Sequence, residues 1–592
     1  MLKIERILST LFRNLSHLKK YFVRYKTKLV LGIIFILGSN LANVYIPINV
    51  KQGIDSLSRQ ADYHVIVNLV ILLLAAGIIS NIFRFFIRQT IIVVSREIEF
   101  DLRQDFWAHI QKLPLRFFQN NSTGNIMSHA TNDISAVRMY VGPAVMYSID
   151  NGIKFILTFA VMISLSPILT LYAMLPLPLL SFVVYIVMKK MHVKYTRIQE
   201  KISDLTTKAQ ENFSGIRVIK SYEREDHEIK EYTKESAEYL NRKMDQVKLQ
   251  ALFMPVFFII AGLSAIIVVL AGGNMVINKT LSVGVIVAFM LFLVDLIWPM
   301  ISFGWVANMI QQADASMKRL LKILNEPYEI SNEETDNSIQ EVKGDIEFKN
   351  VSFRYSENLP WILKDLSFKI KHGQTIAFIG HTGVGKTSLI NLLPRLYDVT
   401  EGHVMIDGND VRKIPLDVLR KNIGIVPQET FLFSDTLEKN ILYGLDVENQ
   451  SLVDKVSEIS QLSKDVTSFP LGYQTILGER GITLSGGQKQ RSTLARALAV
   501  DPKILILDDS FSAVDTNTEE EILKKLKDFM NDRTSIIISH RISTVKDSDK
   551  IFVIDHGKII EEGNHEELVA KGGIYADLHT KQLLEKELLE MN

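Results

Sequence analysis

The chain has 592 residues, too many for a single domain, and its 67 basic and 66 acidic side chains nearly cancel. This balance argues against a nucleic-acid-binding protein, and the absence of cysteine excludes disulfides, cysteine-ligated metal centres and thiol catalysis. The mean hydropathy of +0.14 is an average over the whole chain, so one part of it must be strongly apolar.

The chain begins with a basic segment. Residues 1–28 carry eight Lys or Arg and one Glu. An apolar set recurs there at helical spacing: Phe12, Leu15, Leu18, Phe22 and Tyr25. This pattern predicts an amphipathic helix on the cytoplasmic membrane surface. The apolar run Leu29–Val50 is long enough to span a bilayer and lacks a small-residue cleavage site, so we expect an uncleaved span and not a signal peptide.

Five further apolar runs follow, at Val65–Ile87, Val141–Leu165, Leu169–Met188, Ala251–Gly273 and Val283–Val306. Short connections join spans 1 and 2, spans 3 and 4, and spans 5 and 6, whereas long charged segments separate the other pairs. Six spans therefore predict tight turns on one side of the membrane and two long helical excursions on the cytoplasmic side. Turn residues at Asn120–Asn125 and Asn212–Gly215 predict a break at the tip of each excursion.

Four charged residues lie inside the predicted spans, where unpaired charge is costly. Arg84 is near the cytoplasmic end of span 2, where its side chain is expected to snorkel to the membrane surface. Asp150 and Lys154 lie four residues apart in span 3, and we expect them to neutralise each other. Asp295 in span 6 has no partner nearby in the sequence. It is a candidate for contacting a cationic substrate, and the alternative is that a neighbouring helix satisfies it.

The second half contains a phosphate-binding pattern. Gly380–Thr387 fits G-x-x-x-x-G-K-[ST] between an apolar strand, Thr375–Ile379, and an apolar helix start, Ser388–Leu393. The glycines let backbone N–H groups surround a phosphate. Lys386 is expected to reach the β- and γ-phosphates of ATP, and the Thr387 hydroxyl to bind Mg²⁺.

Further polar residues end buried strands or open helices. Asp508 and Asp509 follow the apolar strand Ile504–Leu507, and a carboxylate there is the second Mg²⁺ support of such NTPases. Gln428 and His540 each end another strand, where ligands bind in α/β sheets. Tyr355 either stacks on the adenine or is a strand-end aromatic.

A second anion cradle precedes the helix Ser492–Val500. Leu484–Gln488 lies about a hundred residues beyond the phosphate loop, and its Ser-Gly-Gly presents a helix N-terminus. A single ATP in one small domain does not easily require both the phosphate loop and this second cradle. We therefore expect the second cradle to bind a nucleotide that is held by a neighbouring chain.

In order and spacing these motifs resemble the ATPase domain of ABC transporters. Gly380–Thr387 is similar to Walker A, Gln428 to the Q-loop glutamine, Leu484–Gln488 to the signature sequence, Ile504–Asp508 to Walker B, Ser512–Asp515 to the D-loop and His540 to the switch histidine. Thr475–Gly481 resembles the exporter-type X-loop, and the six spans with long excursions resemble the type I exporter (type IV) membrane domain.

The resemblance implies a membrane all-α domain of six transmembrane helices with long cytoplasmic extensions, fused to an α/β P-loop NTPase domain. The expected divisions are an N-terminal segment at 1–28, a membrane domain at 29–325, a linker at 326–342 and an ATPase domain at 343–592. In the family, two ATP molecules lie between Walker A of one subunit and the signature of the other. The excursion tips act as coupling helices, one contacting its own ATPase domain and one the partner's.

The resemblance also assigns the site. The residues expected to bind ATP are Tyr355, Gly380, His381, Thr382, Gly383, Val384, Gly385, Lys386, Thr387 and Ser388 and, toward the partner's nucleotide, Ser485, Gly486, Gly487 and Gln488. The expected Mg²⁺ ligands are Thr387, Gln428 and Asp508, and the expected catalytic residues are Asp509, His540 and Gln428.

One position departs from the family pattern, because Asp509 stands where Glu usually polarises the attacking water. Asp is shorter by roughly 1.5 Å, so the sequence predicts a slow site beside an intact signature. Such a pairing favours one subunit of a heterodimer, and a homodimer stays open.

We expect an ATP-driven exporter of a drug, lipid or peptide in a bacterial plasma membrane, with its N-terminus and ATPase domain in the cytoplasm. The alternative is a membrane-anchored regulatory or gating subunit that binds nucleotide without pumping.

Overall fold

The computed structural model describes residues 14–478, 481 and 483–590. They fall into two compact units, which we describe separately. The first comprises the chain up to Gln111 together with Thr123–Glu326, and the second comprises Lys112–Ser122 together with the chain from Pro327 onward. The tip of the first excursion therefore belongs to the same unit as the second half of the chain.

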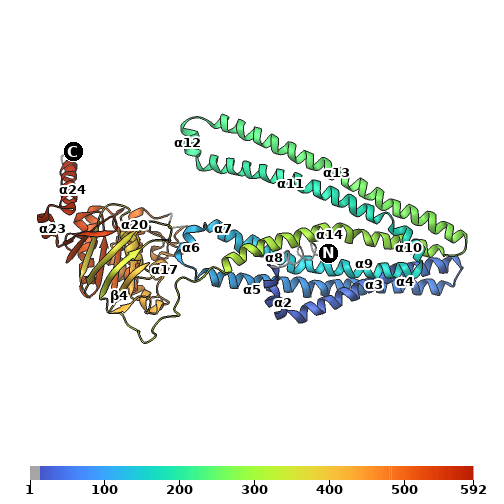
Figure 1. Ribbon diagram of the computed structural model, residues 1–592, viewed down its shortest axis with the longest axis horizontal. Coiled ribbons are helices and arrows are strands. Elements are labelled where there is room, and N and C mark those ends of the chain that lie inside the picture. The colour runs from blue at the N-terminus through green and yellow to red at the C-terminus, as the bar shows by residue number, and fades with distance from the viewer. Residues whose placement is uncertain (1–13, 479–480, 482, 591–592) are drawn as a thin grey trace. The chain divides into compact units, whose positions relative to one another are not determined.

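Within its described residues the first unit is helical. Its elements are η1 (Leu15–Leu18), α2 (Lys19–Arg24), α3 (Lys26–Ser58), α4 (Tyr63–Ile87), η2 (Arg88–Ile92), α5 (Val93–Ile110), α7 (Thr123–Ser128), η3 (His129–Asp133), α8 (Ile134–Met139), η4 (Tyr140–Ala144), α9 (Val145–Leu165), α10 (Pro167–Met174), α11 (Leu177–Ser214), α12 (Ile216–Ser221), α13 (Glu225–Ile277) and α14 (Val283–Leu324). Helices α11 and α13 form a long hairpin with α12 at its tip (Figure 1). Breaks fall within both predicted tip segments, before Thr123 and at Gly215.

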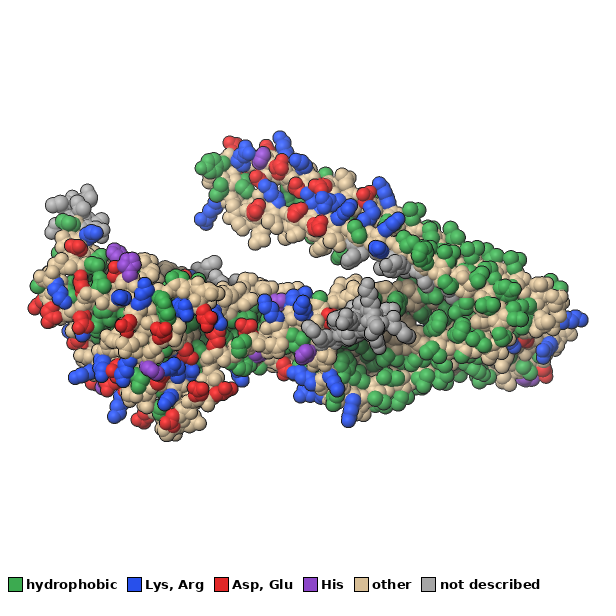
Figure 2. All heavy atoms as spheres, in the orientation of Figure 1, with side chains coloured by type: hydrophobic (Ala, Val, Ile, Leu, Met, Phe, Trp, Pro, Cys, Tyr) green, Lys and Arg blue, Asp and Glu red, His purple; other side chains and the backbone are tan. Residues whose placement is uncertain are grey.

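Among the described residues, five helical stretches are long and apolar enough to cross a membrane: Lys26–Ser58, Tyr63–Ile110, Thr123–Leu165, Glu225–Ile277 and Val283–Leu324. They contain five of the six predicted spans. The remaining one, Leu169–Met188, is divided between α10 and α11, because Pro176 lacks an N–H and cannot continue α10. Hydrophobic side chains gather over one end of the unit, whereas charged side chains crowd the α12 end of the hairpin (Figure 2).

The N-terminal segment differs from the predicted surface helix. Its described part, from residue 14 on, forms two short helices, η1 and α2, and the start of α3. Of the predicted apolar set, Leu15 and Leu18 are buried within the protein and Phe22 and Tyr25 are half-buried. Phe12 lies outside the described residues. Three ion pairs connect α2 and the start of α3 to α5: Lys20–Asp105 at 2.7 Å, Arg24–Asp101 at 2.6 Å and Lys28–Glu97 at 2.5 Å. Acidic residues on α5 thus draw the segment onto the helix bundle.

The charged residues in the spans pair differently from the prediction. Lys154 Nζ donates to Asp295 Oδ1 at 2.8 Å, joining α9 to α14. Asp150 instead accepts a hydrogen bond from Asn40 Nδ2 at 2.7 Å. The predicted Asp150–Lys154 neutralisation is therefore wrong, because helix packing offers each residue a partner on another helix. Asp295 is satisfied by its neighbour, which removes the reason for assigning it to a cationic substrate.

The second unit contains two sheets. One is antiparallel, in the order β2-β1-β4-β5, and is built from β1 (Ile346–Phe353), β2 (Leu363–Ile370), β4 (Glu401–Ile406) and β5 (Asn409–Asp410). The other has the order β10-β9-β3-β8-β7-β6 and is built from β3 (Thr375–Ile379), β6 (Ile423–Val426), β7 (Ile504–Asp508), β8 (Thr534–Ile538), β9 (Lys550–Asp555) and β10 (Lys558–Gly563). In this second sheet only β10 pairs antiparallel.

The helices of this unit are α6 (Leu115–Asn120), α15 (Lys386–Asn391), α16 (Leu416–Lys421), α17 (Leu437–Ile441), α18 (Gln450–Ile459), α19 (Ser463–Val466), η5 (Gly472–Gln474), α20 (Gly486–Ala499), α21 (Thr516–Met530), α22 (Ile542–Val545), α23 (His565–Lys571) and α24 (Ile574–Glu590).

The parallel sheet positions the site. Its strand β3 alternates between two hydrophobic cores, with Ile376 and Phe378 in one and Ala377 and Ile379 in the other. Strands buried on both faces in this way are continuous apolar runs. Since β3, β8 and β7 are parallel neighbours, their carboxyl ends bring the chain segments that follow them to one edge of the sheet.

Candidate functional site

The phosphate loop leaves β3 through a backbone that only glycine adopts easily. Gly380, Gly383 and Gly385 all have positive φ, at 154°, 87° and 105°. A Cβ on Gly380 would collide with the carbonyl group of Ile554, and one on Gly385 would lie 3.0 Å from the side chain of Ile362. The loop is therefore fixed both by conformation and by close packing against the strands beside it.

Lys386 lies across this loop. Its Nζ donates to the carbonyl oxygens of Gly380 and His381, both at 2.8 Å. Burial lowers the pKa of Lys386, while the negative charges of Asp508 and Asp509 act to raise it. The lysine is thus held at the loop beside two carboxylates, where an incoming phosphate can replace the carbonyl oxygens as its partner.

The predicted metal ligands meet next to Lys386. Thr387 Oγ1 donates to Asp508 Oδ2 at 2.8 Å, which joins the start of α15 to the end of β7. Burial raises the pKa of Asp508, and the hydrogen bond from Thr387 opposes that rise. Hydroxyl, carboxylate and amide oxygens are the ligands that Mg²⁺ prefers, so this set fits the ion.

One cavity, with a volume of about 240 Å³, collects most of the predicted site. It is lined by Tyr355, Ile362, Thr382, Gly383, Gly385, Lys386, Thr387, Ser388, Gln428, Asp508, Asp509, Ile538 and His540. These residues come from six separate stretches of sequence. Among the described residues that line it, none belongs to the signature Leu484–Gln488.

Two of the three candidate catalytic residues, Asp509 and His540, follow the neighbouring strands β7 and β8. Asp509 has φ 45°, a left-handed conformation that Asp tolerates better than most residues, and its N–H donates to Ile538 O at 2.8 Å. His540 follows β8. Burial lowers the pKa of His540, and the positive charge of Lys386 adds to this effect. The imidazole is therefore neutral at pH 7 and can exchange hydrogen bonds with a phosphate or a water.

Tyr355 connects the cavity to the first excursion. Its hydroxyl hydrogen-bonds Ser388 Oγ at 2.7 Å, and its ring meets that of Tyr397 edge to face, with centroids 5.2 Å apart. Burial raises the pKa of Tyr397, and the side chains of Gln119 and Arg116 on α6 act to lower it. Arg116 also forms an ion pair with Glu329. Tyr397 could not be found from the sequence, because an aromatic residue after a helix belongs to no motif.

The signature forms a capped helix start elsewhere in the unit. Ser485 Oγ accepts from Gln488 N at 3.3 Å, and Gln488 Oε1 accepts from Ser485 N at 3.0 Å, which is a capping box on α20. Gln490, which the motifs did not single out, donates to Ser512 Oγ and accepts from Ala513 N, both at 2.9 Å. The signature helix is thereby tied to the D-loop. In the X-loop, Glu479 and Arg480 lie outside the described residues.

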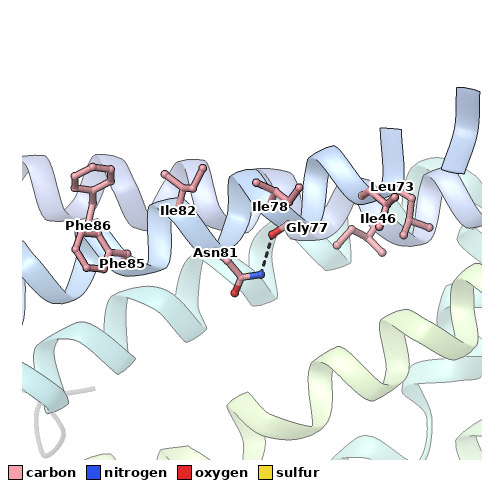
Figure 3. Close-up of a pocket in the computed structure, with 9 residues that line it drawn as sticks. Ile46, Leu73, Gly77, Ile78, Asn81, Ile82, Phe85 and Phe86 are labelled. Carbon is pink, nitrogen blue, oxygen red and sulfur yellow. Dashed lines mark hydrogen bonds between the residues drawn. The ribbon is translucent and has the colours of Figure 1, made fainter. Parts of the chain in front are cut away.

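The membrane unit has an apolar groove of about 720 Å³ along α3 and α4. Its lining is apolar except for Asn81, whose amide is turned onto its own helix and donates to Gly77 O at 2.8 Å (Figure 3). Asn81 is one turn of helix from Phe85, with Ile78 and Ile82 alongside. Such a lining accepts hydrocarbon and offers nothing to a charged group.

Comparison with known proteins agrees with this architecture. Residues 29–300 match the family model described as the ABC transporter transmembrane region, and residues 363–512 match the family model described as ABC transporter. The probable multidrug resistance ABC transporter ATP-binding/permease protein YheI of Bacillus subtilis is 33% identical, with 97% of this chain and 98% of the relative covered. The ATP-dependent lipid A-core flippase of Syntrophus aciditrophicus is 34% identical, with 84% of this chain and 82% of the relative covered.

Among solved structures, a bacterial Atm1-family ABC exporter with ATP bound matches with a TM-score of 0.76 and 25% identity, over 94% of this chain and 98% of that one. Both domains and their order are thus shared with these proteins. The chain belongs to the ABC transporter family, as a multi-pass membrane protein that carries its own ATPase domain.

Proposed function

We propose that this chain is one half of a dimeric exporter that uses ATP to move a hydrophobic or amphipathic substrate (a drug, lipid or peptide) across a membrane by alternating access. The observation that carries the proposal is the cavity of the second unit, which gathers Tyr355, Lys386, Asp508, Asp509 and His540 while the signature lies outside it. The relatives are named as a multidrug resistance transporter and a lipid flippase. Those names support export and give no support to a subunit that only gates.

The polar residues of the cavity have distinct roles in this proposal. Backbone N–H groups of the phosphate loop and Lys386 bind the phosphates, and Tyr355 stacks on the base. Asp509 orients the attacking water, and the neutral His540 holds it against the γ-phosphate. Because these groups are fixed before ATP arrives, they contribute by positioning and electrostatics.

Thr387, Gln428 and Asp508 are the residues that would hold Mg²⁺. The bound ion supplies positive charge to the phosphate oxygens during transfer. The metal set within the chain contains a single carboxylate, which leaves further coordination positions for phosphate oxygens and water.

The two halves of the ATP site are expected to come from different chains. The residues Ser485, Gly486, Gly487 and Gln488 lie at the N-terminus of α20, and none of them lines the cavity. We therefore propose that this helix N-terminus closes over the partner's nucleotide. Tighter binding of ATP to the closed dimer is what drives the conformational change. The partner is either a second copy or a related chain with Glu at the position of Asp509.

Transport follows from the way the excursions leave the spans. We propose that α6 and α12 are the coupling helices and that both face the cytoplasm with the N-terminus and the ATPase domain, in a bacterial plasma membrane. The corresponding division is an N-terminal segment at 1–28, a membrane domain at 29–325, a linker at 326–342 and an ATPase domain at 343–592.

The test is transport by the purified full-length chain in liposomes. Vesicles that contain the chain are expected to accumulate a fluorescent lipid or lipophilic dye in an ATP-dependent manner, and the substrate should stimulate ATP hydrolysis. Lys386→Ala should abolish both, whereas Lys371→Ala, at an exposed position just before β3, should change neither. ATP binding with no accumulation of any probe, both by the chain alone and by the chain reconstituted together with a related chain that carries Glu at the position of Asp509, would instead favour the gating subunit.

A further inference from the structure

The terminal helix α24 reaches the segment after β8 through one side chain. Gln582 Nε2 donates to His540 O at 2.6 Å, and Gln582 Oε1 accepts from Ile542 N at 2.8 Å. A single amide therefore holds the backbone on both sides of Arg541. The side chain of His540, at one end of this clamp, lines the cavity.

Helix α24 is anchored firmly enough to act as a reference point. The Glu561 carboxylate accepts from Ile574 N at 2.7 Å and from Tyr575 N at 3.2 Å, which caps the first turn. Tyr575 is fully buried, and its hydroxyl hydrogen-bonds His565 Nδ1 at 2.7 Å. The position of Gln582 is thus fixed by the hydrophobic core and by β10.

Gln582 occupies a position on α24 where the helical periodicity predicts an apolar residue. Ile574 and Leu578 pack against the core, and Gln582 is the next position on the same face at a spacing of four. A half-buried amide is costly unless its polar atoms are paired. Both of its polar atoms find partners, and both partners lie on the backbone around Arg541.

Side-chain contacts tie the same segment to the helix after the D-loop. Arg541 forms an ion pair with Glu519 of α21, and Thr544 Oγ1 donates to Glu519 Oε1 at 2.6 Å. Arg541 N also donates to Ser539 Oγ at 3.0 Å. These contacts fix Arg541 and α22, whereas the carbonyl oxygen of His540 itself accepts its hydrogen bond from Gln582.

We infer that Gln582 is a positioning residue for ATP hydrolysis, which keeps the His540 imidazole aimed into the cavity by holding its backbone carbonyl. The inference rests on the proposed role of His540. The competing explanation is that Gln582 only caps α22, whose first residue is Ile542. In that case its loss would lower stability without changing turnover.

The experiment measures single-turnover ATP hydrolysis by the full-length chain in lipid nanodiscs, since this readout remains usable for a slow site. Gln582→Met keeps the length and the packing but removes both hydrogen bonds. Gln582→Glu keeps the acceptor for Ile542 N–H and places an oxygen against His540 O. Lys581→Met, at the exposed neighbouring position, is the matched control.

We expect Gln582→Met to lower the maximal rate about tenfold with the half-saturating ATP concentration within about twofold, because a ~1 Å misplacement can cost on the order of a hundredfold. Gln582→Glu should be slowed at least as much, and Lys581→Met should match the unmodified chain. In a His540→Ala background, Gln582→Met should have no further effect, since both changes act on the same group.

A normal maximal rate in a folded Gln582→Met or Gln582→Glu variant overturns the inference, as does an additive effect in the His540→Ala background. If Gln582→Met does not fold, Gln582→Glu decides the matter alone. A His540→Ala variant with an unchanged rate instead removes the proposed role of His540. A rate that falls for His540→Ala but not for the Gln582 variants removes only the inference.

Discussion

The tips of the two excursions differ in how far they are buried within the described chain. On the first tip, α6 belongs to the compact unit of the ATPase domain, Phe117 is only 7% exposed and Arg116 forms an ion pair with Glu329. On the second tip, Phe213 beside α12 is 77% exposed and Tyr222 is 76% exposed. Large exposed aromatics at a helix tip mark a contact surface. The first tip is therefore buried within the second unit, whereas the second tip exposes aromatic side chains, which the proposed function assigns to contact with the partner subunit.

The ATP site shows the same division. The cavity with Lys386 and Asp508 is assembled within the chain, whereas the capped signature at Ser485 contributes nothing to it among the described residues. The following substitutions distinguish the features that form within one chain from those that the proposed function assigns to a dimer. They run from the largest expected effect to the smallest.

Changing Ser485 should separate hydrolysis from nucleotide binding. Ser485→Asp keeps a good helix cap but places negative charge where a phosphate is expected. Hydrolysis should fall by more than about a hundredfold, on the order of the loss of one preorganised donor, while the affinity of the chain's own cavity for a fluorescent ATP analogue stays the same. Lys386→Ala should lose that affinity. If Ser485→Asp hydrolyses ATP normally, the signature does not face a nucleotide.

Lengthening Asp509 should speed the chain's own site. Asp509→Glu restores the missing reach and should raise the steady-state ATPase rate of the isolated chain by about ten- to a hundredfold, because ~1 Å of misplacement costs up to that much. Asp509→Asn, with the same size and no charge, is the control and should not be faster than the unmodified chain. Brisk hydrolysis by the unmodified chain that survives Asp509→Ala contradicts the proposal.

Truncating the two tip phenylalanines should affect different properties. Phe117→Ala should destabilise the protein by about 3 kcal/mol, because the side chain is buried. Phe213→Ala should change the free energy of unfolding by less than about 0.5 kcal/mol, as for other exposed positions. It should instead weaken the association of the two halves and uncouple substrate from ATPase stimulation. Thermal unfolding measures the loss of stability, and substrate-stimulated ATPase activity measures the loss of coupling. Equal destabilisation by Phe117→Ala and Phe213→Ala would contradict the difference in burial between the two tips.

The Arg116–Glu329 ion pair should contribute least. Both side chains are more than a third exposed, at 43% and 35%, so a double-mutant cycle with Arg116→Ala and Glu329→Ala should give a coupling energy below about 1 kcal/mol. High salt should reduce it further. A much larger coupling energy would mean that the contact is held rigidly as part of force transmission.

The sequence by itself determined the class of protein and most of the nucleotide cavity. A glycine-rich loop between a buried strand and a helix carries its own geometry, as the positive φ of Gly380 and Gly385 shows. The apolar runs likewise located the spans, except where Pro176 divides one of them between two helices. These features are local, so each can be recognised from the neighbouring residues alone.

Only the tertiary structure decided which polar groups meet across the fold. Lys154 pairs with Asp295 on α14 and not with Asp150 one turn away, and acidic residues of α5 hold the N-terminal segment that was expected on the membrane surface. Gln582 reaches His540 from a helix forty residues further along. Sequence spacing cannot rank such partners, because the packing of distant helices and strands fixes the distances that select one of them.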